Sequence, residues 1–148
     1  MVVAVDKLER FFRLAGSVDV DKSDLRRYEE FLNRKLHDLL IRAEATAKAN
    51  GRDVMRRTDV PVTKGLQECL HRFDDLLAEV PVRPALELIV AQPPMDLAYG
   101  DDLEAWLPDL AGGLSVALAR TFRIVDPEVK NPQTRHWEQI FQLFDLLL

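Results

Sequence analysis

Apolar residues recur at helical spacing along the first part of the chain and predict a short helix followed by a long one. Leu8 and Phe12 belong to a helical stripe over residues 6–15, which Gly16 would end in the left-handed conformation. A second series, uninterrupted by glycine or proline, predicts one helix over about residues 22–50: Leu25, Tyr28, Leu32, Leu36, Leu39, Ala43 and Ala47. Such a helix spans roughly 40 Å. It cannot be buried within half of this chain, so we expect it to cross a second long helix.

The segment after the long helix predicts a tight loop and then a helix of medium length. Val54 and Met55 favour a brief strand. Asp59 is a good helix-capping residue, and Pro61 fits a first helical turn, where its missing amide hydrogen has no partner to lose. We therefore expect a helix that begins at Asp59 and extends to about Glu79.

Beyond residue 80 the chain repeats the order of short, long and medium helices. The predicted ranges are 84–92, 101–125 and 132–148. Pro108 lies inside the long segment, where a proline either kinks a helix or starts a new one, and the pattern leaves both alternatives open. We therefore predict an all-α protein with two units, residues 1–80 and 81–148, folded together as one compact structural unit.

Composition adds an electrostatic difference between these units. The 148 residues are 47% hydrophobic and 30% charged, as expected of a globular chain, and the net charge is −5. Residues 1–78 carry a net charge of +1, whereas residues 79–148 carry −6. This balance argues against a protein that coats nucleic acid through bulk positive charge.

The chain shows no sign of a membrane or secreted protein. It has no run of 18 apolar residues, and the apolar stretch at residues 1–5 is too short for a signal peptide. The single cysteine, Cys69, rules out an internal disulfide framework and fits a reducing compartment. We expect a cytoplasmic protein that has no membrane partner.

Short, long and short helices joined by two loops are the layout of the histone fold, and the first unit resembles that fold in more than layout. Residues 10–52 are similar, without a gap, to the archaeal histones, including Ala15-Gly16 and the uninterrupted long helix. The segment at residues 51–60, Gly-Arg-Asp-Val-Met-Arg-Arg-Thr-Asp-Val, resembles the second loop of that family, Gly-Arg-Lys-Thr-Ile, three further residues and Asp-Ile. The second unit shares only the helix lengths.

Two such folds in one chain resemble a bacterial family of paired histone folds. The resemblance implies an intramolecular pseudodimer, in which the second fold supplies the partner that a histone fold needs. It also implies a structural clamp, because the arginine and the later aspartate of that loop form a salt bridge in archaeal histones. In this chain those residues are Arg52 and Asp59.

Archaeal histones contact the phosphate backbone through basic residues of the first helix and the loops. The resemblance therefore gives four DNA-contact candidates: Arg10, Arg13, Arg56 and Arg57. Three replacements count against DNA wrapping: Asp19 stands where an arginine reaches DNA, Asp53 replaces a basic loop residue, and Val54 replaces a hydrogen-bonding threonine. Two functions stay open. One is a histone-like protein with weak association to DNA or the nucleoid, and the other is a protein-interaction or self-association module that does not bind DNA.

No pattern predicts catalysis. The chain has no Gly-rich phosphate loop, no Gly-x-Ser-x-Gly and no His-Glu-x-x-His, so we expect no catalytic residue, metal, cofactor or small-molecule substrate. Cys69 is expected to be a small core residue and His136 a helix-start residue. Gly112-Gly113 favours close helix crossing, and the acidic residues at 101–104 suit a helix N-terminus.

Overall fold

The computed structural model describes the backbone of residues 2–148 and the side chains from residue 5 onward, and it is predominantly helical. The helices are α1 (Val2–Gly16), α2 (Leu25–Ala49), α3 (Lys64–Leu77), α4 (Arg83–Ile89), α5 (Asp101–Val125) and α6 (Thr134–Leu147). Short 3-10 turns, η1 and η2, occupy Lys22–Asp24 and Arg57–Asp59, and two-residue strands β1 and β2 occupy Val54–Met55 and Ala98–Tyr99. No described helix is long and apolar enough to span a bilayer.

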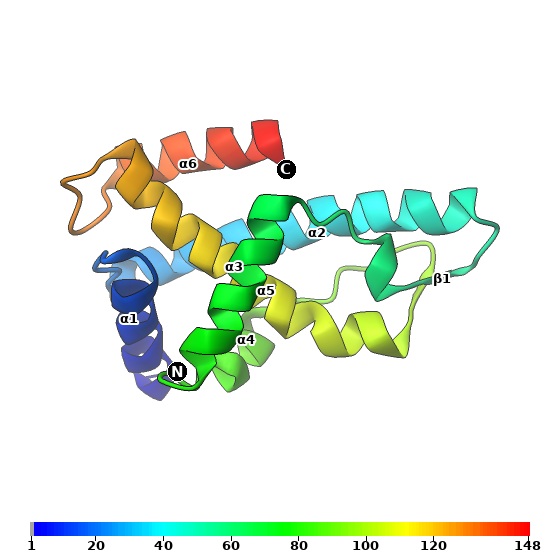
Figure 1. The fold of residues 1–148 in the computed structure, drawn as a ribbon, viewed down its shortest axis with the longest axis horizontal. Coiled ribbons are helices and arrows are strands. Elements are labelled where there is room, and N and C mark those ends of the chain that lie inside the picture. Colours follow the sequence, from blue (N-terminus) through cyan, green and yellow to red (C-terminus); the bar gives the residue numbers. More distant parts are fainter. Residues whose placement is uncertain (1) are drawn as a thin grey trace.

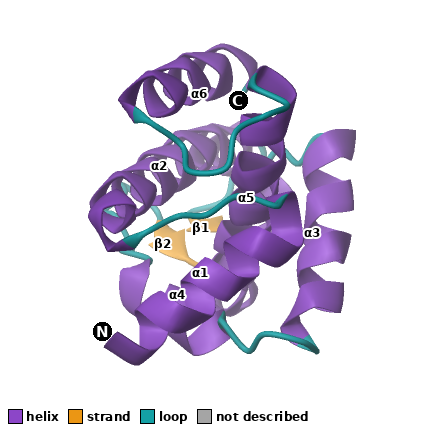
Figure 2. Cartoon of the chain, turned by 90° about the vertical axis from the view of Figure 1, so that its left-hand side faces the viewer, coloured by secondary structure: helices purple, strands orange, loops and turns teal. Residues whose placement is uncertain are grey.

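Helix α5 forms the centre of the molecule. The other helices all contact it, and Figure 2 shows it lying between α2 and α3. Fourteen of its 25 residues are buried, and they include every residue from Leu110 to Val116. Helix α2 has the same length but buries nine residues, which include the predicted stripe from Tyr28 to Ala47, whereas Leu25 is only partly buried. The hydrophobic core therefore follows α5 and is covered by the remaining helices.

The two long helices contact each other, as the length of the first one predicted. At this contact the Tyr28 hydroxyl of α2 lies 2.6 Å from Ser115 Oγ of α5, with both side chains buried. Ser115 Oγ donates to the carbonyl of Ala111 at 2.7 Å, so the tyrosine hydroxyl is the donor to Ser115. Phe12 of α1 packs edge-on against the Tyr28 ring. This polar contact at the centre of the apolar core ties the two halves of the chain together.

The loops of one half pair with the loops of the other. Strand β1, which follows α2, runs parallel to β2, which precedes α5, with Val54 opposite Ala98. On the other side of the molecule, the loop that precedes α2 meets the loop that follows α5, where the Asp19 amide donates to the Lys130 carbonyl at 2.6 Å. Arg123 also donates to the Ser17 carbonyl at 2.8 Å. The pairing is reciprocal, because each long helix is flanked by two loops that bind the opposite half.

The start of α3 differs from its prediction. The helix begins at Lys64, and the Thr63 hydroxyl caps it by accepting from the Leu66 amide at 3.2 Å. Asp59 lies instead in the turn η2, and Val60 is extended, so Pro61 precedes the helix. The carboxylate of Asp59 binds Arg52 and the Arg56 amide, so it closes its own loop and does not cap α3.

Several other helices are shorter than predicted. Helix α2 starts after the turn η1, whose capping residue is Asp21, and α4 ends at Ile89 rather than at residue 92. Helix α6 starts at Thr134. Gly16 is not left-handed, since Ser17 takes the positive φ of 55°. A Cβ on Gly16 would lie 2.3 Å from the Ala119 carbonyl oxygen, so this glycine permits the close contact of α1 with α5.

Pro108 neither ends nor restarts α5, which is continuous from Asp101 to Val125. Because proline has no amide hydrogen, the carbonyl four residues earlier loses its usual donor. That carbonyl belongs to Glu104, and Arg83 of α4 donates to the next one along the helix, the Ala105 carbonyl, at 3.0 Å. The close crossing predicted at Gly112-Gly113 is confirmed, because a Cβ at these two positions would lie 2.3 Å and 2.6 Å from side-chain atoms of α3.

Candidate interaction surfaces

The loop between α2 and α3 is closed by a bidentate ion pair. The Arg52 guanidinium donates to the two carboxylate oxygens of Asp59 at 2.7 Å and 2.6 Å. Asp59 is buried and also accepts from the Arg56 amide at 2.8 Å. The hydrogen bonds from Arg52 hold the pKa of the Asp59 carboxyl below its usual value. The structure therefore brings the two clamp residues together, and Arg52 is engaged within its own loop.

Next to this loop, Arg57 is held against α5. Its amide donates to Asp102 at 3.2 Å, and its guanidinium carbon lies 4.6 Å from the centre of the Trp106 ring. That distance is typical of a cation–π contact. Nearby, the backbone of the same loop is bonded to the residue before α5, because the Gly100 amide donates to the Met55 carbonyl at 2.8 Å. Arg57 thus connects the loop of the first half to the long helix of the second.

The four DNA-contact candidates do not form one patch. Arg10 and Arg13 belong to α1, whereas Arg56 and Arg57 directly follow β1, which lies on the opposite side of the molecule (Figure 1). Arg13 forms an ion pair with Asp19 at 3.0 Å. Arg10 and Arg56 are exposed, and among residues 5–148 neither has a carboxylate within ion-pair distance. Two of the four guanidinium groups are therefore occupied, and the other two lie far apart.

Carboxylates surround the β1–β2 pair. Asp53, Asp101 and Asp102 are exposed there, and Asp96 forms an ion pair with Lys48 at 3.3 Å. Like charge at such a surface repels phosphate. The region around the clamp therefore carries mixed charge and is not a positive face.

The loop after α5 is closed by different residues. Nε2 of His136 lies 2.9 Å from Asp126, and Nδ1 accepts from the Gln133 amide at 2.8 Å. His136 is 2% exposed and stands in the first turn of α6, as its helix-start prediction required. The hydrogen bond from His136 lowers the pKa of the Asp126 carboxyl. Nothing in the sequence indicates this pair, because ten residues separate its members.

A buried lysine links α2 to α6. The Lys35 side chain is 2% exposed, and its Nζ lies 2.9 Å from Asp38 and 2.7 Å from Asp145. Arg34 binds the same Asp145 at 2.6 Å. These cations lower the pKa of the Asp145 carboxyl. Sequence reasoning missed this cluster, although Lys35 stands beside Leu36 in the apolar stripe of α2.

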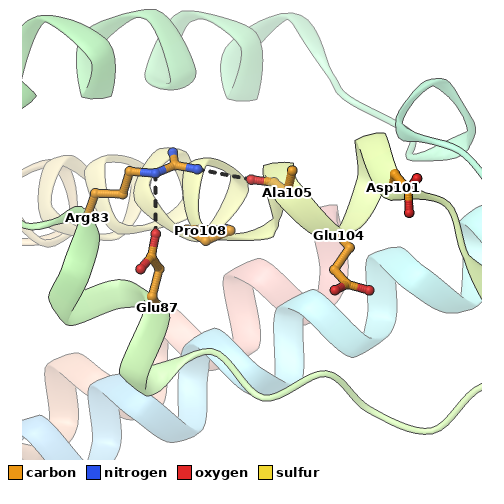
Figure 3. A pocket seen from close by; sticks show the side chains of 6 residues that line it. All are labelled: Arg83, Glu87, Asp101, Glu104, Ala105 and Pro108. Carbon is orange, nitrogen blue, oxygen red and sulfur yellow. Dashed lines mark hydrogen bonds and ion pairs between the residues drawn. The ribbon is translucent and has the colours of Figure 1, made fainter.

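A groove of about 430 Å³ lies between α4 and the first half of α5. Figure 3 shows Arg83 and Glu87 on one wall and Asp101 and Glu104 along the other, with Pro108 between them. Arg83 is engaged by Glu87 at 3.6 Å and by Asp109. The charged residues that line the groove are three carboxylates and one arginine, and no serine, threonine, cysteine or lysine side chain lines it that could act as a nucleophile. Within the described residues no group of three His, Cys, Asp or Glu side chains is arranged to hold a metal ion.

A second hollow, of about 290 Å³, lies where the end of α5 meets the outer side of α6. Five residues line it, and none carries a charge: Val125, Gln139, Gln142, Leu143 and Leu146. Large apolar side chains remain in solvent around it, with Leu146 81% and Leu147 72% exposed. We call the outer residues of α6, Gln139, Gln142, Leu143, Leu146 and Leu147, the α6 seam.

Comparison with known proteins gives relatives without a known function. The chain is 28% identical over 140 residues to an uncharacterised protein of Aquifex aeolicus (strain VF5), covering 95% of this chain and 81% of that protein. A crystal structure from Thermus thermophilus is 47% identical, with a TM-score of 0.85 and coverage of 97% of both chains. A crystal structure from Aquifex aeolicus is 26% identical, with a TM-score of 0.86 and coverage of 98% of this chain and 95% of that one.

The family comparison covers nearly the whole molecule, from the first turns of α1 to the end of α6. Residues 8–145 match the model of DUF1931, described as a domain of unknown function. The match spans both halves and the loops that join them. The chain therefore belongs to the DUF1931 family.

Proposed function

We propose that the chain is a non-catalytic histone-fold protein, in which residues 1–80 and 81–148 form an intramolecular pseudodimer, and that it serves as a protein-assembly module. The reciprocal loop pairing carries this proposal. The loop after α2 binds the loop before α5 through β1 and β2, and the loop before α2 binds the loop after α5. The buried Tyr28–Ser115 contact joins the long helices between these two pairings. Two interlocked short–long–short units would produce this arrangement.

Charge and exposure favour a protein partner over DNA. The paired loops, where a histone would touch phosphate, carry Asp19, Asp53 and Asp96. The side chains of Arg52 and Arg57 already have partners within the chain, Asp59 and the Trp106 ring. The α6 seam, by contrast, leaves aliphatic side chains in solvent, which is typical of an interaction surface.

Weak DNA or nucleoid association is the second candidate. Arg10 and Arg56 favour it, because each is exposed and has no carboxylate partner among residues 5–148. Each arginine that neutralises a phosphate releases counterions, so such binding would weaken steeply with salt. The separation of α1 from β1 limits it to two small patches (Figure 1).

A titration onto duplex DNA at low salt separates the two candidates. The assembly proposal predicts no retardation at tens of micromolar protein. The DNA candidate predicts retardation that is lost when Arg10, Arg13, Arg56 and Arg57 are changed to Glu. A matched control changes Lys64, Arg72, Arg120 and Arg135 to Glu, which alters the net charge equally at other exposed positions. If the wild type binds DNA in a salt-sensitive way, and only the variant of the four candidate arginines loses that binding, the DNA candidate is correct and the assembly proposal is wrong.

The assembly proposal is tested directly by a photo-crosslinking residue placed at Leu146 and, as a matched position, at Leu88 of α4. Both leucines are strongly exposed, at 81% and 74%. We expect protein adducts in cells expressing the full chain from Leu146 and few from Leu88. Equal adduct yields at the two positions, or none at either, would count against an assembly surface on α6.

A further inference from the structure

A third cavity, of about 230 Å³, lies where the turn η2 meets helices α3 and α5. Its two apolar lining residues, Leu70 of α3 and Trp106 of α5, are buried, and the other five are polar or charged. The two helices cross closely here, because Gly113 leaves room for the Leu70 side chain. A cavity of this size and polarity suits a small polar molecule better than a large apolar one. We call it the η2 pocket.

Arg57 supplies the positive charge of the η2 pocket. Its guanidinium stacks on the Trp106 ring at 4.6 Å, and its amide donates to Asp102 at 3.2 Å, so the residue is held against α5 at both ends. A guanidinium that stacks through its face keeps the N–H groups at its edge available as donors. Among residues 5–148 these groups have no acceptor, and no carboxylate lies within ion-pair distance of them. Arg57 is therefore prepared to bind a carboxylate from outside the chain.

Asp74 of α3 supplies a negative charge to the same pocket. It is exposed, and among residues 5–148 it forms no ion pair and no hydrogen bond through its side chain. The other carboxylate of the pocket, Asp109, is bound by Arg83. Asp74 and Arg57 thus line one pocket from different elements, and they lie too far apart to pair with each other. The pocket holds one unpaired cation and one unpaired carboxylate at separate positions.

The polar wall of the η2 pocket belongs to α3. Gln67 and His71 are four residues apart on one face of this helix, and their side-chain Nε2 atoms lie 3.4 Å apart. An amide nitrogen can only donate, so the His71 ring is the acceptor of this contact. The amide oxygen of Gln67 then remains without a donor among residues 5–148. The wall offers an acceptor for a hydroxyl group.

We infer that the η2 pocket binds a free α-amino acid, with its carboxylate on Arg57 and its ammonium group on Asp74. A molecule that carries both charges complements a pocket that holds both opposite charges unpaired. The end of a peptide carries only one of the two charges, so it matches the pocket less well. The polar lining favours a small polar side chain, such as that of serine, whose hydroxyl can donate to Gln67. This inference goes beyond the proposed function, because it concerns a bound ligand and not a protein partner.

The expected affinity is modest. Arg57 and Asp74 are both exposed, so water and salt weaken each charged contact. Serine has only about seven non-hydrogen atoms, and we expect a dissociation constant on the order of 1 mM.

NMR of the two indole N–H groups tests the inference in the full chain. Trp106 lines the η2 pocket, whereas Trp137 packs against Phe122 in the core and serves as an internal control. L-Serine, added up to about 20 mM, should shift the Trp106 signal in a saturable way and leave the Trp137 signal in place. Serine methyl ester lacks the carboxylate and N-acetylserine lacks the ammonium group. Each should bind at least about fivefold more weakly than serine.

Adjacent residues provide matched variants. Arg57→Gln and Asp74→Asn should each raise the dissociation constant for serine at least about fivefold. Arg56→Gln and Asp75→Asn remove the same charges at neighbouring exposed positions that do not line the pocket, and they should change it less than about twofold. An unchanged Trp137 signal verifies that each variant retains the fold.

Three results would overturn the inference: no shift of the Trp106 signal at about 20 mM serine, equal binding by either serine derivative, or equal effects of the pocket variants and their neighbours. Equal binding of N-acetylserine would identify a site for carboxylates alone, and equal binding of the methyl ester a site for amines alone. Neither is the amino-acid site inferred here. Each of these failures leaves the assembly proposal standing, because that proposal is tested on α6.

Discussion

The two long helices, α2 and α5, have 25 residues each but occupy different positions in the core. Helix α2 presents one apolar stripe inward and keeps charged residues such as Glu29, Glu30 and Arg42 in solvent. Helix α5 is buried on nearly every side, because α1, α3 and α4 all pack on it in addition to α2. The halves therefore share an order of elements but not a distribution of burial. Equal length does not imply an equal share of the core.

Composition explains the difference. The middle of α5 is made of small residues, Ala111, Gly112, Gly113 and Ser115, together with aliphatic ones, and it carries no charge from Leu110 to Ala119. Small residues allow neighbouring helices to approach closely, and α3 does so at both glycines. An uncharged helical segment of this kind must be surrounded, whereas an amphipathic helix such as α2 needs only one covered side.

The largest expected effect compares one buried leucine on each long helix. Leu110→Ala in α5 should cost about 3–5 kcal/mol of stability, and Leu36→Ala in α2 about 2–3 kcal/mol. Both side chains are buried, but Leu110 is enclosed by neighbouring helices that cannot all move into the cavity. Chemical denaturation of the two variants measures the difference. A Leu36 variant that loses as much stability as the Leu110 variant would contradict the central position of α5.

The second prediction addresses the contact between the two long helices. Ser115→Ala leaves the buried Tyr28 hydroxyl without its acceptor and should cost about 1–3 kcal/mol. Tyr28→Phe leaves Ser115 still donating to Ala111, so we expect a smaller loss of about 1 kcal/mol. The two changes share one hydrogen bond, and the double variant should lose less than the sum of the single losses. Additive losses in a double-mutant cycle would show that the helices are not coupled at this point.

Sequence patterns predicted the elements that depend on local spacing. The apolar stripe located α2, and the apolar segment at residues 101–125 located α5 with both of its ends. The strand at Val54–Met55 was also predicted and is confirmed. In each case residues near in sequence supply the signal.

The features that escaped prediction depend on distant partners. Lys35 is buried because Asp145, 110 residues away in the sequence, accepts a hydrogen bond from its ammonium group. Asp59 and Thr63 are both good capping residues, but Thr63 caps α3, while the Asp59 carboxylate binds Arg52 and the Arg56 amide. The α6 seam was not predicted, because nothing in the sequence shows that Leu143, Leu146 and Leu147 stay in solvent beside the buried face of Trp137, Ile140 and Phe144.

The third prediction compares the loops that follow the two long helices. Arg52 and Asp59 close the first loop, whereas His136 and Asp126 close the second, so unrelated residues serve the same role. Arg52→Ala should cost about 1–3 kcal/mol, because it leaves the buried Asp59 carboxylate without its charged donor. Arg56→Ala, in the same loop, is the control and should change stability by less than about 0.5 kcal/mol. Equal denaturation midpoints for the Arg52 variant and the wild type would show that the clamp adds nothing.

The smallest expected effect is the acid response of the same two loops. The pKa values of Asp59 and Asp126 are lower in the folded chain than their usual value of 3.8. A carboxyl whose pKa is lower in the folded than in the unfolded chain stabilises the fold. This stabilisation is complete above the pKa of the unfolded chain and is lost as the pH falls through the pKa of the folded chain. Stability should therefore decline as the pH drops below about 4. Denaturation midpoints between pH 6 and pH 2.5 measure this decline in the wild type, in Asp59→Asn and in Asp126→Asn. Asp59→Asn should reduce the acid-induced loss of stability more than Asp126→Asn does. The Asp59 carboxylate is buried and bound by a permanently charged guanidinium, whereas Asp126 is partly exposed. A larger effect at Asp126 would place the stronger closure on the second loop and reverse the comparison.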